Sequence, residues 1–356
     1  MNYTVQIDSH VDEKRWNSQL AQNRGSTLYQ SFNWLKVYQE NIGSKLFFIS
    51  VLSPNGGVVG QLAVLLHKNA LRNENIVAKK LGSTLNLSSV LTWFYGPIIH
   101  ANEGENEITQ TILTSLDRLA KENNVAMIRG SSPPLETKFS NSSFSKYGYD
   151  LTPWATYVVD LQQKSDELYQ KLDKKTRYDI KKSGQNKLEF QITEGPSYFK
   201  EFSELKNEEY ERTRRKKSRV LETYKTEYEY LYKNGFHKVF LAKHKGVPIA
   251  GISDIIFNGN IVQHGVANTK TSLLGGSFVT WHAIEWAIEN NHKTYDMGGI
   301  NPSPSSEKEK NIDFFKSKWG GQKYEYTLYT KILSKTKARL SAALKNPRKI
   351  LQTISS

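Results

Sequence analysis

The chain has 356 residues, with 49 Lys+Arg against 35 Asp+Glu, 12% aromatic residues and no cysteine. This length allows about two domains, and the missing cysteines exclude disulfides and thiolate metal sites. A net charge of +14 favours an anionic partner, either nucleic acid, an anionic membrane surface or a phosphorylated substrate. The N-terminus is polar, and no stretch approaches ~18 apolar residues, so we expect a soluble, intracellular protein.

The first half of the chain carries signals for a hairpin, a helix and a strand, in that order. Two apolar runs within residues 45–69 flank a Pro-Asn-Gly-Gly turn, which predicts a β-hairpin. Apolar residues then recur at helical spacing: Ile108, Ile112, Leu116 and Leu119. A short apolar strand follows at residues 125–130 and ends in Ser-Ser-Pro-Pro.

The second half repeats this order. Residues 237–268 read as three strands with two turns, and residues 277–291 as a helix. Residues 293–302 again form a strand that ends in Gly and Pro. Two related α/β halves, each a mixed sheet with helices packed on it, are the simplest interpretation. We therefore predict domains at residues 1–155 and 156–330, followed by a C-terminal tail at residues 331–356.

The common cofactor motifs are absent. The sequence contains no GxxxxGK[ST], GxGxxG or G-x-S-x-G pattern, and its eight histidines are scattered. We therefore expect no metal site. The turn at residues 269–277 has the glycines of a pyrophosphate-binding turn but only Lys270 as a cation, so the sequence does not support coenzyme A as a cofactor.

Positive charge gathers in particular segments. Residues 211–219 hold six basic residues, and residues 171–187 are rich in lysine. The tail at residues 331–356 holds seven basic residues, no acid and several interleaved Leu and Ile, although Pro347 interrupts any single helix. Such a tail suits an anionic membrane surface; contact with tRNA or packing on the core are the alternatives.

Six segments occur in an order that covers residues 29–330. They are YQSFNWLKVYQENIG (29–43), YGPIIH (95–100), LDKKTRYDIKKSGQNKLEF (172–190), ERTRRKK (211–217), YDMGGINP (295–302) and DFFKSKWGG (313–321). Together they resemble the Fem (FemABX-like) family of peptidoglycan interpeptide-bridge aminoacyltransferases. The resemblance implies tandem acetyltransferase-like (GNAT-like) domains, without the coiled-coil arm of larger members, because residues 206–235 are too few for one.

The resemblance also implies an activity and its partners. An amino acid would move from aminoacyl-tRNA, as co-substrate, to the stem peptide of lipid II or of UDP-MurNAc-pentapeptide. No cofactor is expected. The protein would act as a cytoplasmic monomer, with peripheral contact at the inner face of the membrane. An N-acyltransferase with another acyl donor, or a non-catalytic tRNA- or membrane-binding relative, are the alternative functions.

The resemblance assigns substrate-binding roles to cations. Lys36 is associated with the substrate diphosphate, although a solvated helical lysine is the structural alternative. Thr213 and Arg215 form a Thr-x-Arg step used for the same substrate. Arg212 and Arg214 compete with Arg215, since the register could slip by one, and the whole cluster could instead contact tRNA phosphates.

Lys316 is the expected catalytic residue. The pattern Phe314-Phe315-Lys316 predicts a strand with Phe315 inward and Lys316 on the opposite face. The resemblance places the lysine near the aminoacyl ester and Phe315 beside the substrate. A fixed cation would stabilise the negative charge that develops on the ester carbonyl, or bind the terminal tRNA phosphate. The preceding residues 303–313 are expected to form a mobile rim.

The reaction also needs a general base, because the attacking amine must lose a proton. His100 follows the Gly-Pro turn, where the family often carries an acid; it is either the base or not catalytic at all. His264 stands where relatives tend to carry a tyrosine that faces substrate. Asp296, at the end of a predicted strand, is expected to be structural.

Overall fold

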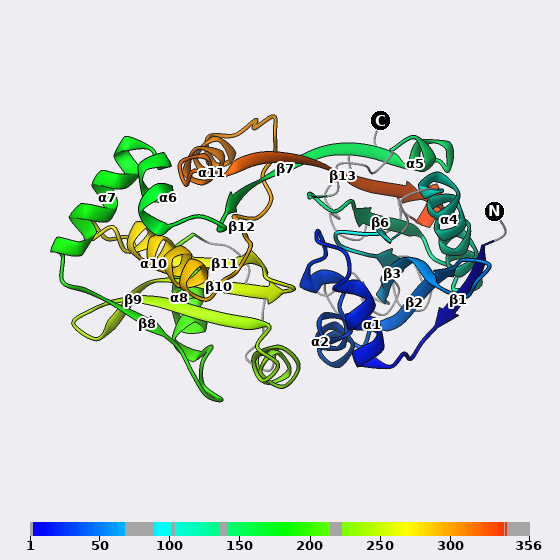
Figure 1. The fold of residues 1–356 in the computed structure, drawn as a ribbon, viewed down its shortest axis with the longest axis horizontal. Helices are drawn as coiled ribbons and strands as arrows, with labels where there is room; N and C mark the ends of the chain where they lie inside the picture. The colour runs from blue at the N-terminus through cyan, green and yellow to red at the C-terminus, as the bar shows by residue number, and fades with distance from the viewer. Residues whose placement is uncertain are drawn as a thin grey trace, which may run out of the picture. The chain divides into compact units, whose positions relative to one another are not determined.

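The computed structural model describes residues 3–67, 89–100, 104–135, 141–213, 223–337 and 339. The chain forms two compact units, Met1–Pro153 with Tyr326–Ser356, and Trp154–Glu325. Each unit is a mixed sheet with helices packed on it (Figure 1), which confirms the predicted α/β fold class. Among the described residues, no helix is both long enough and apolar enough to cross a bilayer.

The first unit, unit 1, holds a sheet in the strand order β1-β2-β3-β4-β6-β13, with β5 paired to β3. β4 and β6 are parallel and are joined through helix α4, whereas the other pairs are antiparallel. Its elements are β1 (Thr4–Asp8), α1 (Glu13–Leu20), η1 (Leu28–Gln30), α2 (Phe32–Ile42), β2 (Lys45–Leu52), β3 (Val58–His67), β4 (Val90–Thr92), β5 (Ile98–Ile99), α4 (Glu105–Glu122), β6 (Met127–Ser131), α5 (Ser142–Lys146) and β13 (Gln322–Ile332).

The second unit, unit 2, holds a sheet in the order β7-β12-β11-β10-β9-β8. Here β11 and β12 are the parallel pair, joined through helix α10. Its elements are β7 (Asp150–Asp160), α6 (Ser165–Lys171), α7 (Lys174–Gln185), β8 (Leu188–Ile192), α8 (Lys200–Arg212), α9 (Thr223–Glu227), η2 (Tyr228–Tyr232), β9 (His237–His244), β10 (Val247–Phe257), β11 (Asn260–Asn268), α10 (Gly275–Glu289), β12 (Thr294–Asp296) and α11 (Glu307–Ser317).

The repeat inferred from the sequence therefore appears as a shared topology. In each unit four antiparallel strands lead through a helix to a fifth strand that is parallel to the fourth, and a further antiparallel strand completes the sheet. That completing strand is β13 in unit 1 and β7 in unit 2. The second domain was predicted to extend to residue 330, but residues 326–330 belong to unit 1, where residues 328–330 pair with β6.

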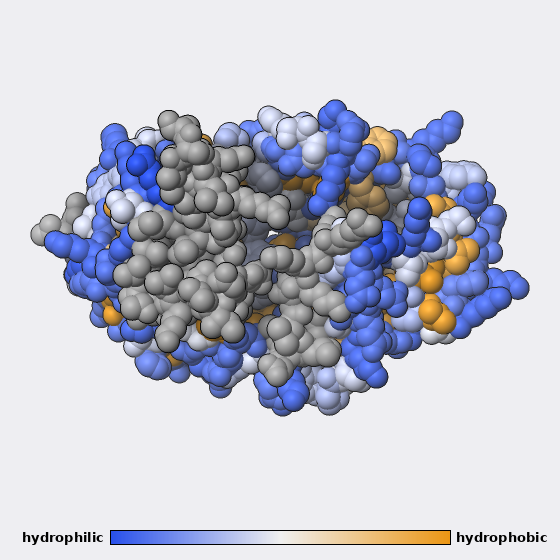
Figure 2. All heavy atoms as spheres, turned by 180° about the vertical axis from the view of Figure 1, so that it is seen from behind, coloured by the Kyte–Doolittle hydropathy of each residue, from blue (hydrophilic) through white to orange (hydrophobic). Residues whose placement is uncertain are grey.

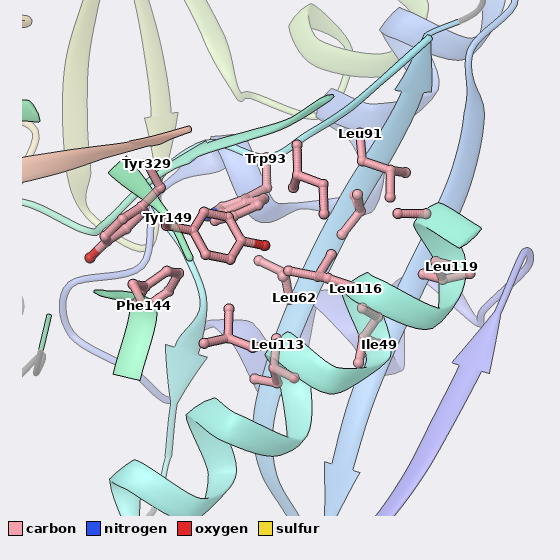
Figure 3. Close-up of a cluster of buried hydrophobic side chains, with 14 of the residues drawn as sticks. Ile49, Leu62, Leu91, Trp93, Leu113, Leu116, Leu119, Phe144, Tyr149 and Tyr329 are labelled. Carbon is pink, nitrogen blue, oxygen red and sulfur yellow. The ribbon is translucent and has the colours of Figure 1, made fainter. Parts of the chain in front are cut away.

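An aromatic cluster closes the core of unit 1 (Figure 3). Phe144 and Tyr329 stack with ring centroids 3.8 Å apart and an interplanar angle of 10°, and Trp93 and Tyr149 pack around them. Aliphatic side chains of α4, including Leu113 and Leu116, continue this core between the helix and the sheet. Because Tyr329 comes from β13, the C-terminal strand supplies part of the core as well as a sheet edge.

Both faces of the unit 2 sheet are covered. Along β9, Phe240 and Ala242 pack with α10 residues, while Val239 and Leu241 pack with residues of α8. This alternation is the period of two expected of a strand buried on both sides. On the described part of the face in Figure 2, the surface is mainly hydrophilic and has only small separate apolar areas.

The segment before Lys316 is helical, so the predicted strand is wrong. Helix α11 begins after Ser306, whose side chain accepts from the Glu309 amide while Glu309 accepts from the Ser306 amide. This capping box satisfies amide groups that the first turn leaves unpaired. The rim expected at residues 303–313 is accordingly helical from Glu307 onward. The basic tail beyond residue 339 lies outside the described residues.

Substitution of Gly130 by alanine tests the packing of unit 1. A Cβ at this position would lie 1.8 Å from a ring carbon of buried Trp93, so we expect a loss of about 3 kcal/mol in the free energy of unfolding. The control is Gly184→Ala in α7, where a Cβ would meet no atom within 4 Å, and which should stabilise by about 0.5 kcal/mol. Denaturant midpoints measure both; equal stability of the two variants would contradict the packing described here.

Candidate functional site

The parallel strands β11 and β12 separate early. Their pairing runs from Asn260 opposite Thr294 only as far as Val262 opposite Asp296. Just beyond this point β11 carries a bulge, because Ser253 and Asp254 of β10 face Gly265 and Gln263, which leaves His264 as the extra residue. Bulges disrupt the ladder locally and are over-represented beside active sites. An opening between the two strands therefore starts at His264.

The equivalent strands of unit 1 do not separate in this way. Beyond β4, the Trp93 amide still donates to the Arg129 carbonyl at 3.1 Å, and the Gly96 amide to the Ser131 carbonyl at 2.9 Å. The two halves thus share a topology but differ at this point, and only in unit 2 does the described backbone open after the parallel pair. This difference makes unit 2 the candidate location of the chemistry.

A tight turn follows β12. The buried carboxylate of Asp296 accepts a hydrogen bond from the Gly298 amide at 2.7 Å and another from the Thr156 hydroxyl. Gly298 has φ of +81°, a conformation that glycine adopts without steric cost. Burial raises the pKa of Asp296, and these hydrogen bonds oppose that shift. Asp296 therefore holds the turn, which agrees with the structural role expected for it.

The ammonium group of Lys316 docks on this turn. Lys316 lies in the last turn of α11, and its Nζ donates to the Gly298 carbonyl at 2.8 Å and to the Gly299 carbonyl at 3.2 Å. An ammonium has three donors. Among the residues that the structure describes, no acceptor lies within hydrogen-bond reach of the third, so one N–H remains for a ligand.

The surroundings of Lys316 change its acidity. Burial lowers the pKa of its ammonium to about 8, and the negative charge of Asp296 works against this decrease. At pH 7 the group is still mostly protonated, because its pKa lies above that pH. A cation that is partly removed from water and held by backbone carbonyls interacts more strongly with an anionic ligand than a solvated lysine does.

Gly298 connects the lysine to the bulged strand. A Cβ at this position would lie 3.3 Å from the Lys316 Nζ and 3.2 Å from the Gln263 carbonyl. A side chain here would therefore press on both groups as well as strain the backbone. The absence of a side chain allows the ammonium, the turn and the strand before His264 to approach one another closely.

Two cations of α8 bind carbonyls of β11 beyond the bulge. Lys206 donates to the Val266 carbonyl and pairs with Glu209 at 2.8 Å, and Arg212 donates to the Asn268 carbonyl at 2.9 Å. Unpaired carbonyls are costly when they leave water, so these contacts replace the hydrogen bonds that β12 no longer makes. Lys206 was not a candidate from the sequence, since nothing distinguishes it there from a solvated helical lysine.

The other predicted site residues of unit 2 make separate local contacts. The Thr213 hydroxyl donates to the Glu209 carbonyl at 2.7 Å, which satisfies the end of α8. Phe315 packs edge-to-face on buried Trp319, with ring centroids 5.8 Å apart, so it belongs partly to the core. His264 is half-buried on the bulge. Arg215 and Arg214 lie outside the described residues.

Lys36 and His100 belong to unit 1. Lys36 projects from α2, donates to Gln39 and lies 3.4 Å from a carboxylate oxygen of Glu40. The His100 Nε2 lies 2.8 Å from the Gln61 side-chain oxygen, and burial lowers the pKa of the imidazole. A neutral imidazole can accept a proton, so this environment is compatible with the role of a base.

A buried polar group near the bulge was not foreseen. Asp254 is fully buried, and the Tyr295 hydroxyl donates to its carboxyl at 2.8 Å, while the amide of Gln263 lies 3.3 Å from that hydroxyl. Burial raises the pKa of the Asp254 carboxyl well above its usual value, and the hydrogen bond from Tyr295 opposes this shift. The three side chains link the adjacent strands β10, β11 and β12. Among the described residues, no group of three or more His, Asp or Glu is arranged to hold a metal ion.

The fold matches solved structures of transferases. FemX has a TM-score of 0.73 at 14% identity, with 96% of this chain and 99% of that chain covered. A tandem GNAT protein from the clavulanic acid biosynthesis pathway has a TM-score of 0.57 at 12% identity, covering 94% and 99%. The C-terminal domain of a putative lysylphosphatidylglycerol synthetase from Agrobacterium fabrum has a TM-score of 0.55 at 11% identity, covering 94% and 96%.

These matches show the fold. The expected Fem-like arrangement of tandem GNAT domains is confirmed, and the chain has a fold shared by acyltransferases. By sequence, no protein-family description and no curated protein matches the chain.

The titration of Lys316 tests the geometry of its site. In protein that carries 13C-labelled but unmodified lysines, one lysine Cε signal should titrate near pH 8, and Lys316→Arg should remove it. Asp296→Asn should move that midpoint to lower pH, because it removes the charge that favours the ammonium. A Lys316 signal that titrates near pH ~10.4, the value for a solvated lysine, would contradict the buried position.

Proposed function

We propose that this chain is an aminoacyltransferase that moves an amino acid from aminoacyl-tRNA to the stem peptide of a peptidoglycan precursor. The observation that carries the proposal is the partly desolvated Lys316 ammonium, fixed by two carbonyls at the opening between β11 and β12. The match to FemX over 96% of the chain and the six ordered segments support the same activity. The acceptor is lipid II or UDP-MurNAc-pentapeptide, and no cofactor is needed.

The reaction is attack of an amine on an ester. The amine nitrogen forms a bond to the ester carbonyl carbon, and the oxyanion that results accepts the remaining N–H of Lys316. The carbon–oxygen bond to the tRNA ribose then breaks, the ribose hydroxyl takes a proton, and the nitrogen loses one. Lys316 thus acts as an electrostatic catalyst that keeps its own proton throughout.

The remaining candidates would bind substrate or move the proton. Lys36, Arg212, Thr213 and Arg215 would contact the diphosphate of the acceptor, where cations offset the cost of desolvating phosphate charge. His264 and Phe315 would line the region next to the amino acid. His100 is the candidate base for the amine proton. The protein would work in the cytoplasm, with peripheral contact at the inner face of the membrane.

A second candidate activity uses the same fold with another acyl donor. The match to a tandem GNAT protein at a TM-score of 0.57 favours it. The two activities differ in the donor, so ribonuclease treatment distinguishes them. Activity that survives complete digestion of the tRNA would support the second candidate.

Substitution of Lys316 tests the catalytic role. Lys316→Ala should lower kcat for transfer from charged tRNA to a muramyl-peptide acceptor by about 100-fold or more, as loss of one oxyanion donor does in other enzymes. Lys308→Ala is the matched control, because Lys308 is an exposed lysine on the same helix. It should change the rate by less than about 2-fold, since a fully solvated charge adds little. Full activity of Lys316→Ala would remove the residue from the mechanism.

The pH dependence separates a cation from a base at position 316. A pKa of about 8 means that Lys316 loses its charge as pH rises through 8, so electrostatic catalysis should decline there. Lys316→Arg keeps its charge, because the guanidinium pKa exceeds ~12. The ratio of wild-type kcat/KM to that of Lys316→Arg, which cancels the titration of the acceptor amine, should therefore fall above pH 8. A ratio that rises through pH 8 would instead identify Lys316 as a base.

A further inference from the structure

Helix α7 presents a basic face that the proposed chemistry does not use. Its twelve residues begin at Lys174, and Lys174, Lys175, Lys181 and Lys182 are exposed, as is Tyr178 at 58%. The opposite face is buried and packs on α10. The helix rises about 18 Å over this length. A long row of cations around an aromatic ring therefore points to solvent.

This face has a fixed orientation. Asp173 caps the helix by accepting from the Lys175 amide at 2.8 Å and the Thr176 amide at 3.3 Å. Beyond the other end, the Asn186 side chain donates to the Leu273 carbonyl at 3.0 Å. Both ends are thus tied to unit 2, so the lysines form a stable surface and not a frayed segment.

The charge on this face is largely uncompensated. Lys175 lies 3.5 Å from Asp179, which is the acidic residue of the helix. Within the described part of the chain, Lys174, Lys181 and Lys182 have no carboxylate within ion-pair distance. Lys182 lies 5.8 Å from the ring centroid of Tyr178 instead. Like charges on one helix face repel one another, so an anionic partner would stabilise this arrangement.

The same face is connected to the catalytic region within unit 2. The Asp173 amide, at the N-terminus of α7, donates to the Lys318 carbonyl at 3.2 Å. Lys318 follows α11 directly, and its Nζ lies 4.8 Å from the ring centroid of Phe314. Figure 1 shows α11, α6 and α7 in one region of unit 2. The row of cations therefore begins next to Asp173, which contacts Lys318, and Lys318 follows Lys316 by two residues in the sequence.

The composition of the face favours RNA over a bilayer. Helices that lie in a membrane interface insert a stripe of Leu, Phe or Trp side chains. In α7, which the structure describes throughout, Tyr178 is the only large exposed apolar side chain. Cations that follow a phosphate backbone, with an aromatic ring on which a base can stack, are the usual composition of a single-strand nucleic-acid surface.

We infer that the exposed face of α7 is a docking surface for the RNA backbone of the donor, which holds the acceptor arm of tRNA while its aminoacyl end reaches Lys316. The inference rests on the proposed function in one respect, namely that the aminoacyl end of the RNA points toward Lys316. The binding surface itself requires only an RNA partner. It assigns phosphate contacts to Lys174, Lys181 and Lys182, and a stacking contact to Tyr178.

The binding test uses the full chain and uncharged tRNA, with fluorescence anisotropy over a series of salt concentrations. The combined change of Lys174, Lys181 and Lys182 to Gln should weaken binding about 10- to 100-fold near 0.1 M salt, and lower the slope of log K against log salt by about 2 to 3. The control changes Lys14, Lys45 and Lys146 to Gln, which removes the same charge from exposed positions of unit 1. It should weaken binding less than 3-fold. Equal losses in both variants, or none in either, would overturn the inference.

Tyr178 separates stacking from charge. Tyr178→Ala should weaken binding about 5- to 50-fold with an unchanged salt slope, whereas Tyr178→Phe should bind like the wild type, because stacking needs only the ring. Phosphatidylglycerol-containing vesicles test the alternative partner. If the α7 lysine variant loses vesicle binding and keeps tRNA binding, the surface belongs to a membrane and the inference is wrong.

Comparing whole charged tRNA with a short aminoacylated donor tests whether the α7 surface contributes to turnover. The same comparison distinguishes failure of the inference from failure of the proposed function. With whole charged tRNA, the α7 lysine variant should show a KM raised about 10-fold or more. With an aminoacylated CCA trinucleotide, which is too short to follow α7, its KM should equal that of the wild type. If the protein transfers the amino acid but the α7 lysine variant binds tRNA as tightly as the wild type, only the inference is wrong. If the α7 lysine variant loses tRNA binding as expected, but the wild type transfers no amino acid from any charged tRNA, only the proposed function is wrong.

Discussion

The separation of two parallel strands is the constraint around which the candidate site is built. After Val262 and Asp296, β11 and β12 stop pairing, and their backbone groups need other partners. Side-chain cations supply them: Lys206 and Arg212 bind carbonyls of β11, and Lys316 binds the turn after β12. The charges thus stabilise an opening that backbone pairing alone would close.

The position of Lys316 follows from that arrangement. Holding an ammonium partly out of water is unfavourable, as its lowered pKa shows, and two carbonyl contacts with the nearby charge of Asp296 offset part of this cost. A third donor remains for a ligand. Groups arranged in advance around developing charge are effective in catalysis because they need no reorganisation during the reaction.

The two units show how a repeated fold can diverge in local structure. Both have the same strand order around one helical crossover, yet in unit 1 the parallel strands continue to pair through Trp93 and Gly96. The aromatic cluster that includes Tyr329 also packs into the core of unit 1. The two copies of a tandem repeat can thus share a topology and still differ in local backbone pairing, which agrees with the general rule that sites are added to folds.

The sequence by itself determined the repeated elements and the α/β class, because apolar spacing in segments such as residues 107–124 and 237–268 reports local periodicity. It also predicted the Fem-like fold, which is confirmed, and a catalytic role for Lys316, which stays a prediction. The capping pair Ser306 and Glu309 was a readable signal for helix α11 that the apparent strand pattern obscured. The tertiary structure alone decided that β13 completes unit 1, that β11 bulges at His264, and that Lys316 meets Gly298. These depend on residues far apart in the chain, since burial and backbone pairing are set by neighbours in space.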